Sequence, residues 1–402
     1  MVTNNEQNKL NVPHLRFPEF HGEWEKCKLG DIAILTKGSG ISKDQRSATG
    51  TPCILYGELY TTYKSEVIDY VVSKTDISDK NLVRSCANDI IIPSSGETAI
   101  DISTARCVLS PDVLLGGDLN IIRLKDGDGR FFSYQLNGVR KYNIAKIAQG
   151  VSVVHLYGES IKGLTVSFPS NKEQQKISTL LSLIDERIAT QNKLIEKFES
   201  LIKGINQRVF MNSGNNYKLG EICEIRSGYS GSQLLSKKGL KVSRIETISG
   251  HKVNMERVGY VAPFESSENY RLRVGDILFS NINSVEYIGN TAFIDKDYDL
   301  YHGMNLLRLT PNHMVVIPFY LYLLLNTNRM LNRFKAVCNK AVSQASINQT
   351  ELGKTVVQIP PINTQEQICE LYQALYTKLE TESHTKSLFQ NQKQYMLRQM
   401  FI

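Results

Sequence analysis

Three short strings contain residue types that could carry out catalysis, and each lacks a part that the chemistry requires. Gly353-Lys354-Thr355 ends like a phosphate-binding loop, but the first glycine of that motif would fall at Asn348. His21-Gly22-Glu23 has the spacing of a nucleobase deaminase, yet no Cys-x-x-Cys follows to complete a zinc site. Gly228-Tyr229-Ser230-Gly231 is not a nucleophile elbow, because Ser232 stands where the turn needs glycine. We therefore expect no catalytic residue and no metal site in this chain.

The composition is that of a globular protein with a weak preference for anionic partners. The 402 residues suggest two or three domains, and 41% hydrophobic residues are enough to give each domain a core. The net charge of +7 is compatible with a polyanionic partner but does not identify one. The first ten residues are polar, no apolar run is long enough to cross a bilayer, and the seven cysteines form no Cys-x-x-Cys pair. These features predict a protein of the reducing cytoplasm.

An internal repeat organises the chain. Lys28-Leu29-Gly30-Asp31-Ile32 recurs as Lys218-Leu219-Gly220-Glu221-Ile222, and Gly38 recurs as Gly228. Three further matches follow in the same order: 89–92 with 276–279, 120–124 with 305–309, and 174–177 with 365–368. Each match is short, but the offset between the copies stays between 185 and 191 residues. The preserved order indicates a tandem duplication.

Each copy begins with a mixed α/β part, predicted over residues 24–170 and 214–360. Short apolar runs at 89–92 and 121–124, bounded by Gly, Asp and Ser, are typical of strands. Residues 131–141 and 318–328 are predicted as helices, the second with Pro318 in its first turn. The irregular order of strands and helices predicts an α+β (mixed α/β) fold for two tandem-duplicated globular domains, and not a doubly wound sheet.

A continuous apolar seam follows each α/β part. Over residues 171–213, alternating steps of four and three residues connect Ile177, Leu181, Ile184, Ile188, Ile195, Phe198, Ile202, Ile205 and Val209, with Gln191 as the polar member. Over residues 361–402, the same frame connects Ile368, Tyr372, Leu375, Leu379, Phe389, Met396 and Met400, interrupted by Glu382, Lys386 and Lys393. So narrow a seam is typical of a coiled coil, and an ordinary amphipathic helix packed on its own domain is the alternative. We expect the two long helices to pair antiparallel, as a rod with the two similar domains at opposite ends in a pseudo-two-fold arrangement.

Such an arrangement suits two kinds of partner. Sites on one face of duplex DNA recur roughly every 34 Å, so two heads on a spacer could read two separated half-sites. A two-headed coiled-coil scaffold could equally hold two protein partners without sequence-specific DNA recognition. The salt dependence of duplex binding separates these hypotheses, because phosphate contacts release counterions.

The start of the chain and the ends of the predicted helices resemble one family. The lead-in Val12-Pro13-His14-Leu15-Arg16-Phe17-Pro18-Glu19-Phe20-His21-Gly22-Glu23-Trp24 precedes Lys28-Leu29-Gly30-Asp31-Ile32. The helix openings are Pro169…Glu173-Gln174 and Pro360…Glu366-Gln367, and the helix ends are Asn206-Gln207-Arg208-Val209-Phe210 and Leu397-Arg398-Gln399-Met400-Phe401. Together with the duplication, these features resemble the specificity (S) subunits of type I restriction–modification systems over essentially the whole chain.

The resemblance implies a non-catalytic reader of DNA. Residues 24–170 and 214–360 would be two target recognition domains, each reading one half of a bipartite, asymmetric site. The helical spacers, 171–213 and 361–402, would set the gap and dock two modification (M) subunits, and residues 1–23 would lie near the C-terminal helix. The M subunits would bind S-adenosylmethionine and methylate adenine at N6, and restriction (R) subunits would use ATP and Mg²⁺ to cleave DNA. This chain itself would bind none of these cofactors.

Candidate DNA contacts come from loops with basic, amide and hydroxyl side chains, which contact phosphates and base edges. Two equivalent Gly/Ser-rich loops and the basic clusters beside them provide Lys37, Ser39, Lys43, Arg46, Tyr63, Lys64, Arg226, Ser227, Tyr229, Lys237, Lys238 and Arg244. A second pair of loops, before the last strand of each repeat, provides Gln149, Ser152, Ser343 and Gln344, and Asn281 and Asn283 could bond adenine edges. Surface turns and solvated charged faces are the alternative for these residues.

Overall fold

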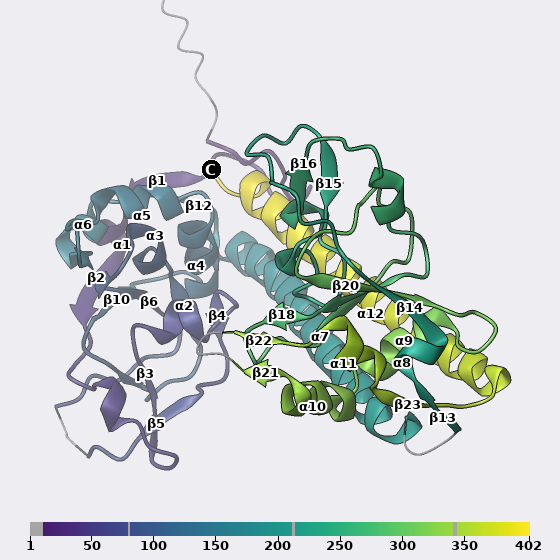
Figure 1. The fold of residues 1–402 in the computed structure, drawn as a ribbon. Helices are drawn as coiled ribbons and strands as arrows, with labels where there is room; N and C mark the ends of the chain where they lie inside the picture. Colours follow the sequence, from purple (N-terminus) through teal and green to yellow (C-terminus); the bar gives the residue numbers. More distant parts are fainter. Residues whose placement is uncertain (1–10, 79–80, 211–213, 341–343) are drawn as a thin grey trace, which may run out of the picture. The chain divides into compact units, whose positions relative to one another are not determined.

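The computed structural model describes residues 11–78, 81–210, 214–340 and 344–402. They form two compact units, the first of residues up to Lys193 with Glu382–Ile402, and the second of Leu194–Thr381. Each unit contains one α/β domain and a segment of both long helices, α7 (Asn171–Val209) and α12 (Ile362–Gln399) (Figure 1). This division differs from the boundaries predicted from the repeat, which treat each helix as a separate spacer, because apolar seam residues of both helices belong to the cores of the units.

The first domain is built around a sheet with the strand order β2-β10-β6-β8-β4, in which β4 runs parallel to β8 and the other pairs are antiparallel. Its first and last strands, β1 and β12, pair with each other immediately before α7 begins. The elements of this domain are β1 (Glu25–Lys28), α1 (Leu29–Ile32), β2 (Ala33–Lys37), β3 (Thr51–Ile54), α2 (Glu58–Thr61), β4 (Val67–Ile68), β5 (Ser73–Thr75), β6 (Asp89–Pro93), β7 (Ser95–Gly96), α3 (Ala99–Ile102), β8 (Arg106–Val108), β9 (Leu114–Leu115), β10 (Leu119–Leu124), α4 (Gly129–Asn137), α5 (Lys141–Ile147), β11 (Val154–His155), α6 (Gly158–Lys162) and β12 (Thr165–Phe168).

Both faces of this sheet are covered, which explains why its strands have continuous apolar runs. Ile90 and Ile92 of β6 face a cluster that includes Phe131 of α4 and Leu181 of α7. Ile91, between them, points to the other face and packs in a cluster with Leu59. All three isoleucines are fully buried, and each contributes about 1.5–3 kcal/mol by its removal from water.

The second domain repeats this plan with the sheet order β14-β20-β17-β19. Its first and last strands, β13 and β23, again pair with each other before the long helix begins. The elements are β13 (Asn215–Lys218), α8 (Leu219–Ile222), β14 (Cys223–Ser227), β15 (Leu240–Val242), β16 (Gly259–Val261), β17 (Ile277–Ser280), β18 (Ile282–Asn283), β19 (Thr291–Phe293), β20 (Leu306–Pro311), α9 (Pro318–Leu325), α10 (Asn328–Val337), β21 (Asn339–Lys340), β22 (Ala345–Ser346), α11 (Gln349–Gly353) and β23 (Val356–Ile359).

The strand register corrects one of the sequence matches between the copies. Lys37, which precedes Gly38, pairs with Asn120, whereas Ser227, which precedes Gly228, pairs with Leu307. The predicted match of 120–124 with 305–309 is therefore wrong by two residues. A shift of two leaves each side chain on the same face of the strand, so the apolar alternation could not reveal it.

The two predicted helices exist, but both end earlier than expected. The first, predicted over 131–141, ends as α4 at Asn137, because Gly138 leaves the helical conformation with a ψ of −108°. A separate helix, α5, begins at Lys141. The second, predicted over 318–328, ends as α9 at Leu325, and Thr327 starts α10 by accepting a hydrogen bond from the backbone N–H of Met330.

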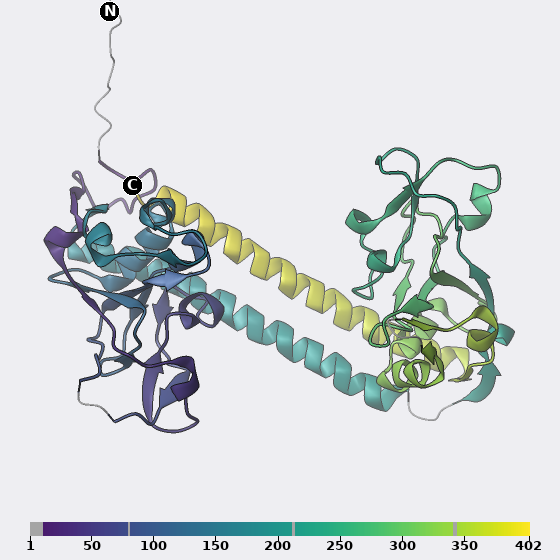
Figure 2. The same cartoon turned by 60° about the vertical axis from the view of Figure 1, so that its left-hand side comes forward.

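The long helices pair antiparallel within each unit, as predicted (Figure 2). In the first unit, Gln191 donates to the backbone carbonyl of Glu382 at 3.1 Å, and the Arg187 guanidinium lies 5.7 Å from the ring of Phe389. In the second unit, Tyr372 donates to Asn206. Every seam position of both helices is buried or half-buried, the polar ones included. None of the described helices combines the length and apolar composition needed to cross a membrane.

A buried ion network explains the polar interruption of the second seam. Lys393 of α12 is 8% exposed, and its Nζ donates to Asp185 of α7 at 2.5 Å and to Glu66, which precedes β4. Tyr134 of α4 also donates to Asp185, at 2.8 Å. Burial disfavours the charge of Lys393, but attraction to Glu66 and Asp185 outweighs it and raises the pKa of the lysine above its ordinary value. The network ties both helices to the first domain.

A pair of equivalent glutamines ties each long helix to its own domain. Gln174 of α7 accepts from the backbone N–H of Asp128 at 3.0 Å and donates to the carbonyl of Pro169 at 2.8 Å. Gln365 of α12 accepts from Ile317 at 2.8 Å and donates to the carbonyl of Pro360 at 2.8 Å. Both side chains are buried, and each satisfies backbone groups that would otherwise be orphaned. This shared role accounts for the repeated glutamine in the sequence.

The described part of the lead-in packs beside the end of α12 in the first unit. The backbone N–H of Leu15 donates to the carbonyl of Gln399 at 2.9 Å. Arg16 holds the buried Glu173 by two hydrogen bonds of 2.8 Å, and Trp24 packs against Phe131 and Phe401. The lead-in thus closes the core around the first turn of α7.

Candidate nucleic-acid interface

The glycine loop that follows the first sheet strand has the same backbone contact in both domains. A Cβ atom on Gly38 would lie 1.9 Å from the carbonyl oxygen of Gly116, and one on Gly228 would lie 1.9 Å from that of Gly303. Only glycine allows so close an approach of two backbones. The repeated glycine of the sequence therefore reflects a shared loop position and not a flexible tip.

A hollow opens beside this loop in the first domain. It has a volume of about 920 Å³, and three segments and Ser94 line it: the glycine loop with the residues up to Arg46, the turn 55–58 with the end of α2, and the segment 116–118. Lys37, Lys43 and Arg46 supply positive charge, and the buried Glu58 lies 3.7 Å from the Arg46 guanidinium. We call this hollow, and its counterpart in the second domain, the glycine-loop cavity.

The counterpart in the second domain is lined by the matching segments. Residues 230–233 follow its glycine loop, 244–246 follow β15, and 304–305 precede β20, around a volume of about 430 Å³. Arg244 lines it, with Nε 3.4 Å from the carboxylate of Glu246. Each cavity thus combines an arginine, a nearby glutamate and polar backbone.

These cavities are suited to recognition and carry no metal-binding chemistry. Arginine, glutamine and asparagine can bond base edges, and lysines at a rim can contact phosphates. Across residues 11–402, apart from the short segments that the structure does not describe, no cluster of three His, Cys, Asp or Glu side chains could hold a metal ion.

The structure gathers only some of the predicted contacts into these cavities. Lys37, Lys43, Arg46 and Arg244 line them, whereas the Ser39 hydroxyl points back and accepts from the backbone N–H of Val83 at 2.7 Å. Arg226 and Ser227 line a different cavity of the second domain. Tyr229 stacks on Phe264 with the ring centroids 3.9 Å apart. Lys237 and Lys238 are exposed on the following loop and line none of these hollows.

Two predicted contacts of the first domain lie elsewhere. Tyr63 is a core residue, 8% exposed, whose hydroxyl accepts from the backbone N–H of Val72 at 3.2 Å. Burial raises the pKa of Tyr63 to about 12. Its placement among surface contacts was wrong, because alternation of a tyrosine with lysines does not reveal which side chain points inward. Lys64 donates to the carbonyl of Thr61 at 2.8 Å, outside the glycine-loop cavity.

The described residues around the second pair of loops belong to equivalent strand pairs, but the predicted residues do not match one to one. Gln149 lies on the first arm of the hairpin, bridged to His155, and Ser152 lies at its exposed tip. Ser343 lies outside the described residues, and Gln344 is exposed just before β22. β11 pairs with β7 in the first domain, and β22 pairs with β18 in the second.

The two asparagines near β18 differ in role. Asn283 has a turn role, because its amide donates to Ser280 at 3.0 Å and its Oδ1 accepts from the backbone N–H of Ser284 at 2.8 Å. The side-chain oxygen of Asn281 is buried without a partner among the described residues. Neither asparagine lines a glycine-loop cavity.

Several lining residues were not among the contacts predicted from the sequence. Gln45, Tyr56, Thr62 and Asp118 line the cavity of the first domain, and Gln233 and Asn305 line that of the second. Tyr56 and Asp118 come from turns far from the glycine loop, and only the sheet brings them to it. Gln45 and Gln233 could have been found as the amide side chains nearest the glycine loops.

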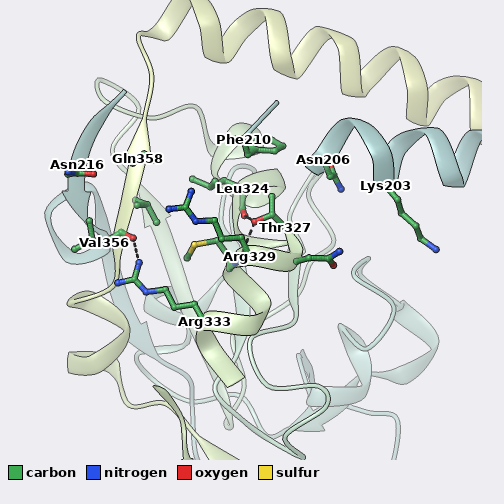
Figure 3. A pocket seen from close by; sticks show the side chains of 13 residues that line it. Lys203, Asn206, Phe210, Asn216, Leu324, Thr327, Arg329, Arg333, Val356 and Gln358 are labelled. Atoms are coloured by element: carbon green, nitrogen blue, oxygen red, sulfur yellow. Dashed lines mark hydrogen bonds between the residues drawn. The ribbon is translucent and has the colours of Figure 1, made fainter. Parts of the chain in front are cut away.

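A further cavity of the second unit lies between the end of α7 and α10 and contains none of the predicted contacts (Figure 3). It has a volume of about 430 Å³ and is lined by Lys203, Phe210 and Arg333, among others. Arg333 donates to the carbonyl of Val356 at 2.6 Å.

Comparison with known proteins decides the family. The sequence profile described as "Type I restriction modification DNA specificity domain" matches residues 21–200 and again 213–388. The chain belongs to this family. The predicted identification as a specificity subunit, a chain that recognises DNA and is not an enzyme by itself, is thereby confirmed, and the two matches confirm the duplication.

Named relatives agree with this assignment. The chain is 38% identical to the type I restriction enzyme MjaX specificity subunit of Methanocaldococcus jannaschii, over 46% of this chain and 44% of that protein. It is 22% identical to the MjaVIII specificity subunit of the same organism, over 98% of this chain and 94% of the relative. The crystal structure of the type I restriction–modification S subunit from M. genitalium has the same fold, with a TM-score of 0.62 and 18% identity over 97% of this chain and 99% of that one.

Proposed function

We propose that this specificity subunit reads a bipartite, asymmetric DNA site, with one domain on each half. The glycine-loop cavities carry the proposal, because matching segments build a polar hollow with an arginine in its lining in both copies. The residues that differ between the hollows, such as Lys43 and Arg46 in one and Gln233 and Arg244 in the other, would give each domain its own base preference.

We infer further that the helix pair sets the gap between the half-sites and docks two adenine-N6 methyltransferase (M) subunits. Apolar side chains that point away from the seam support a protein-binding role for both helices. In the first unit they include Leu183, Leu388 and Tyr395, and in the second Leu194, Leu201 and Leu371, each between 37% and 59% exposed. S-adenosylmethionine would be bound by the M subunits, and ATP and Mg²⁺ by R subunits in the full complex, all in the cytoplasm.

A map of N6-methyladenine in the source cell, with and without this gene, tests the proposal. Loss of one split, asymmetric motif on deletion would support the reader role and supply both half-sites. Replacement of residues 24–170 by those of a relative should then change one half only. If both halves of the methylated motif changed, or if neither changed while methylation persisted, the proposal that each domain reads one half-site would be contradicted.

Duplex binding by the purified chain separates the reader from a protein scaffold. Each neutralised phosphate contributes about −0.9 to the slope of log affinity against log salt concentration. A reader should show a steep negative slope and a preference for the mapped motif. A slope near zero would favour the two-headed scaffold.

A further inference from the structure

A second cavity of the second domain lies on the other side of its glycine loop. Its volume is about 370 Å³, and its polar lining includes Arg226, Ser227, Asn269, His302 and Arg308. The loop supplies Arg226 and Ser227 to this cavity and Ser230 to the glycine-loop cavity, so the two hollows flank the same loop. We call it the arginine cavity.

Arg308 is the unusual residue of this lining. The residue is 8% exposed, and its guanidinium donates to two backbone carbonyls, of Arg271 at 3.1 Å and of Asn269 at 3.2 Å. Its Nε is buried without a partner, and no ion pair reaches the side chain among the described residues. Neutral carbonyls do not carry a countercharge, so the positive charge of this buried side chain has no anionic partner among the described residues.

A second arginine stands directly opposite. In the register of β14 and β20, Arg226 pairs with Arg308, and like charges in such a pair destabilise a sheet. The carboxylates on this face are already engaged, since Glu224 accepts from Arg226 at 2.7 Å and Asp276 accepts from Thr310 at 2.6 Å.

His302 also lines the cavity but adds no positive charge at neutral pH. Burial lowers the pKa of His302 to about 4, and its Nε2 lies 2.9 Å from the carbonyl oxygen of Leu306. The uncompensated positive charge of the cavity therefore comes from Arg308, because Glu224 already balances Arg226.

The first domain shows that the fold itself does not need these arginines. There, the register pairs Thr36 with Ile121 at the places of Arg226 and Arg308. Ile121 is fully buried in an apolar cluster with Ile91 and Leu119. The second copy thus carries a buried cation where the first carries ordinary core.

We propose that the arginine cavity binds a phosphate group of duplex DNA. Guanidinium groups match phosphate oxygens in a planar fork, and hydroxyl and amide groups such as those of Ser227 and Asn269 commonly complete such sites. This inference rests on the proposed function: the phosphate would hold one strand in register while the adjoining glycine-loop cavity meets the bases. The contact is independent of sequence and belongs to the second domain only.

The test measures how the affinity of the full-length chain for a random-sequence duplex depends on salt. Arg308→Gln and, separately, Arg226→Gln should each make the slope of log affinity against log salt concentration less negative by about one. If wild type and variant bind equally at 1 M salt, this change corresponds to an affinity loss of about eightfold at 0.1 M salt. Arg333→Gln is the matched control, because it removes the same charge from α10, whose Phe334 packs on Phe279 of the opposite sheet face. The control should leave the slope unchanged.

The outcomes distinguish the inference from the proposed function. If the wild-type chain shows no salt-dependent binding, the proposed function fails first. If it binds with a steep slope and both cavity variants keep that slope with unchanged melting temperatures, the arginine cavity is not a DNA site. Should Arg308→Gln fail to fold, the exposed Arg226 still decides the question. The other possible ligand is free phosphate, which is tested by titrating the chain with inorganic phosphate in the absence of DNA. Tight binding of inorganic phosphate, together with unchanged duplex slopes in the variants, would show that the ligand is a free anion and would overturn the assignment.

Discussion

Replacing Lys393 by methionine should destabilise the first unit by about 3–5 kcal/mol, the usual cost of removing one partner from a buried ion pair. Methionine keeps most of the side-chain volume, but it leaves Glu66 and Asp185 as two buried carboxylates without their cation. The two hydrogen bonds that Lys393 donates give a similar destabilisation, because each charge-assisted hydrogen bond contributes about 1.5–3 kcal/mol.

The single tryptophan makes this measurement specific. Trp24 is buried in the core of the first unit, so its fluorescence during urea unfolding reports that unit. Lys162→Met is the control, because it breaks the surface pair with Glu159 and should cost less than about 1 kcal/mol.

Two further measurements test whether the unpaired buried carboxylates cause the destabilisation of the Lys393 variant. The triple variant Lys393→Met, Glu66→Gln, Asp185→Asn should recover much of the loss, because no buried charge then lacks a partner. The pKa of Lys393 is raised on folding, so its contribution is fully present below its ordinary pKa of 10.5 and is lost as the pH rises through the higher folded value. A loss below about 1 kcal/mol in the single variant, or a triple variant as unstable as the single one, would refute the reasoning.

Three other predictions follow from the fold and the proposed site. Gly228→Ala should lower the stability of the second unit by about 1–3 kcal/mol and weaken duplex binding, because the new Cβ would meet the carbonyl of Gly303 at 1.9 Å; urea unfolding followed by circular dichroism measures the first effect and titration of a duplex the second. Folding lowers the pKa of His302 from 6.5 to about 4, so between these pH values the unfolded chain binds a proton that the folded chain does not. The wild-type unit should therefore lose about 3 kcal/mol of stability as the pH falls from 6.5 to 4, and His302→Asn should remove this loss. Insertion of four residues between Ile188 and Ile195 adds about 6 Å of helix and should lengthen the gap of the methylated motif or abolish methylation.

Each of these predictions has a distinct contrary result. Gly204→Ala, at an open helical position, serves as the control for the glycine variant and should not destabilise the chain. An unchanged dependence of stability on acid pH in the histidine variant would mean that folding does not depress the pKa of His302. An unchanged gap with full methylation would contradict the role of the helix pair as a spacer.

Local patterns in the sequence determined the features that depend on neighbours along the chain. The alternating steps of three and four residues located both helix seams, because a helix places such positions on one stripe whatever surrounds it. The strand at 89–92 and the repeated glycine loops were equally visible, since apolar runs and close backbone contacts restrict residue type locally. The duplication followed from short strings repeated in the same order, and the family resemblance followed from the lead-in and from the helix openings and ends, together with that duplication.

Only the tertiary structure decided which polar residues belong together. The polar seam position Lys393 is satisfied by Glu66, 327 residues away, and no local pattern could indicate that partner. Likewise, Tyr63 turned out to be core, and Tyr56 and Asp118 joined the glycine loop only because the sheet brings distant turns together. The pairing of Arg308 with Arg226 depends on strand register, which a shift of two residues changes without altering the apolar alternation. Periodicity reports which side of an element faces the core, whereas charge compensation and cavity lining depend on contacts across the chain.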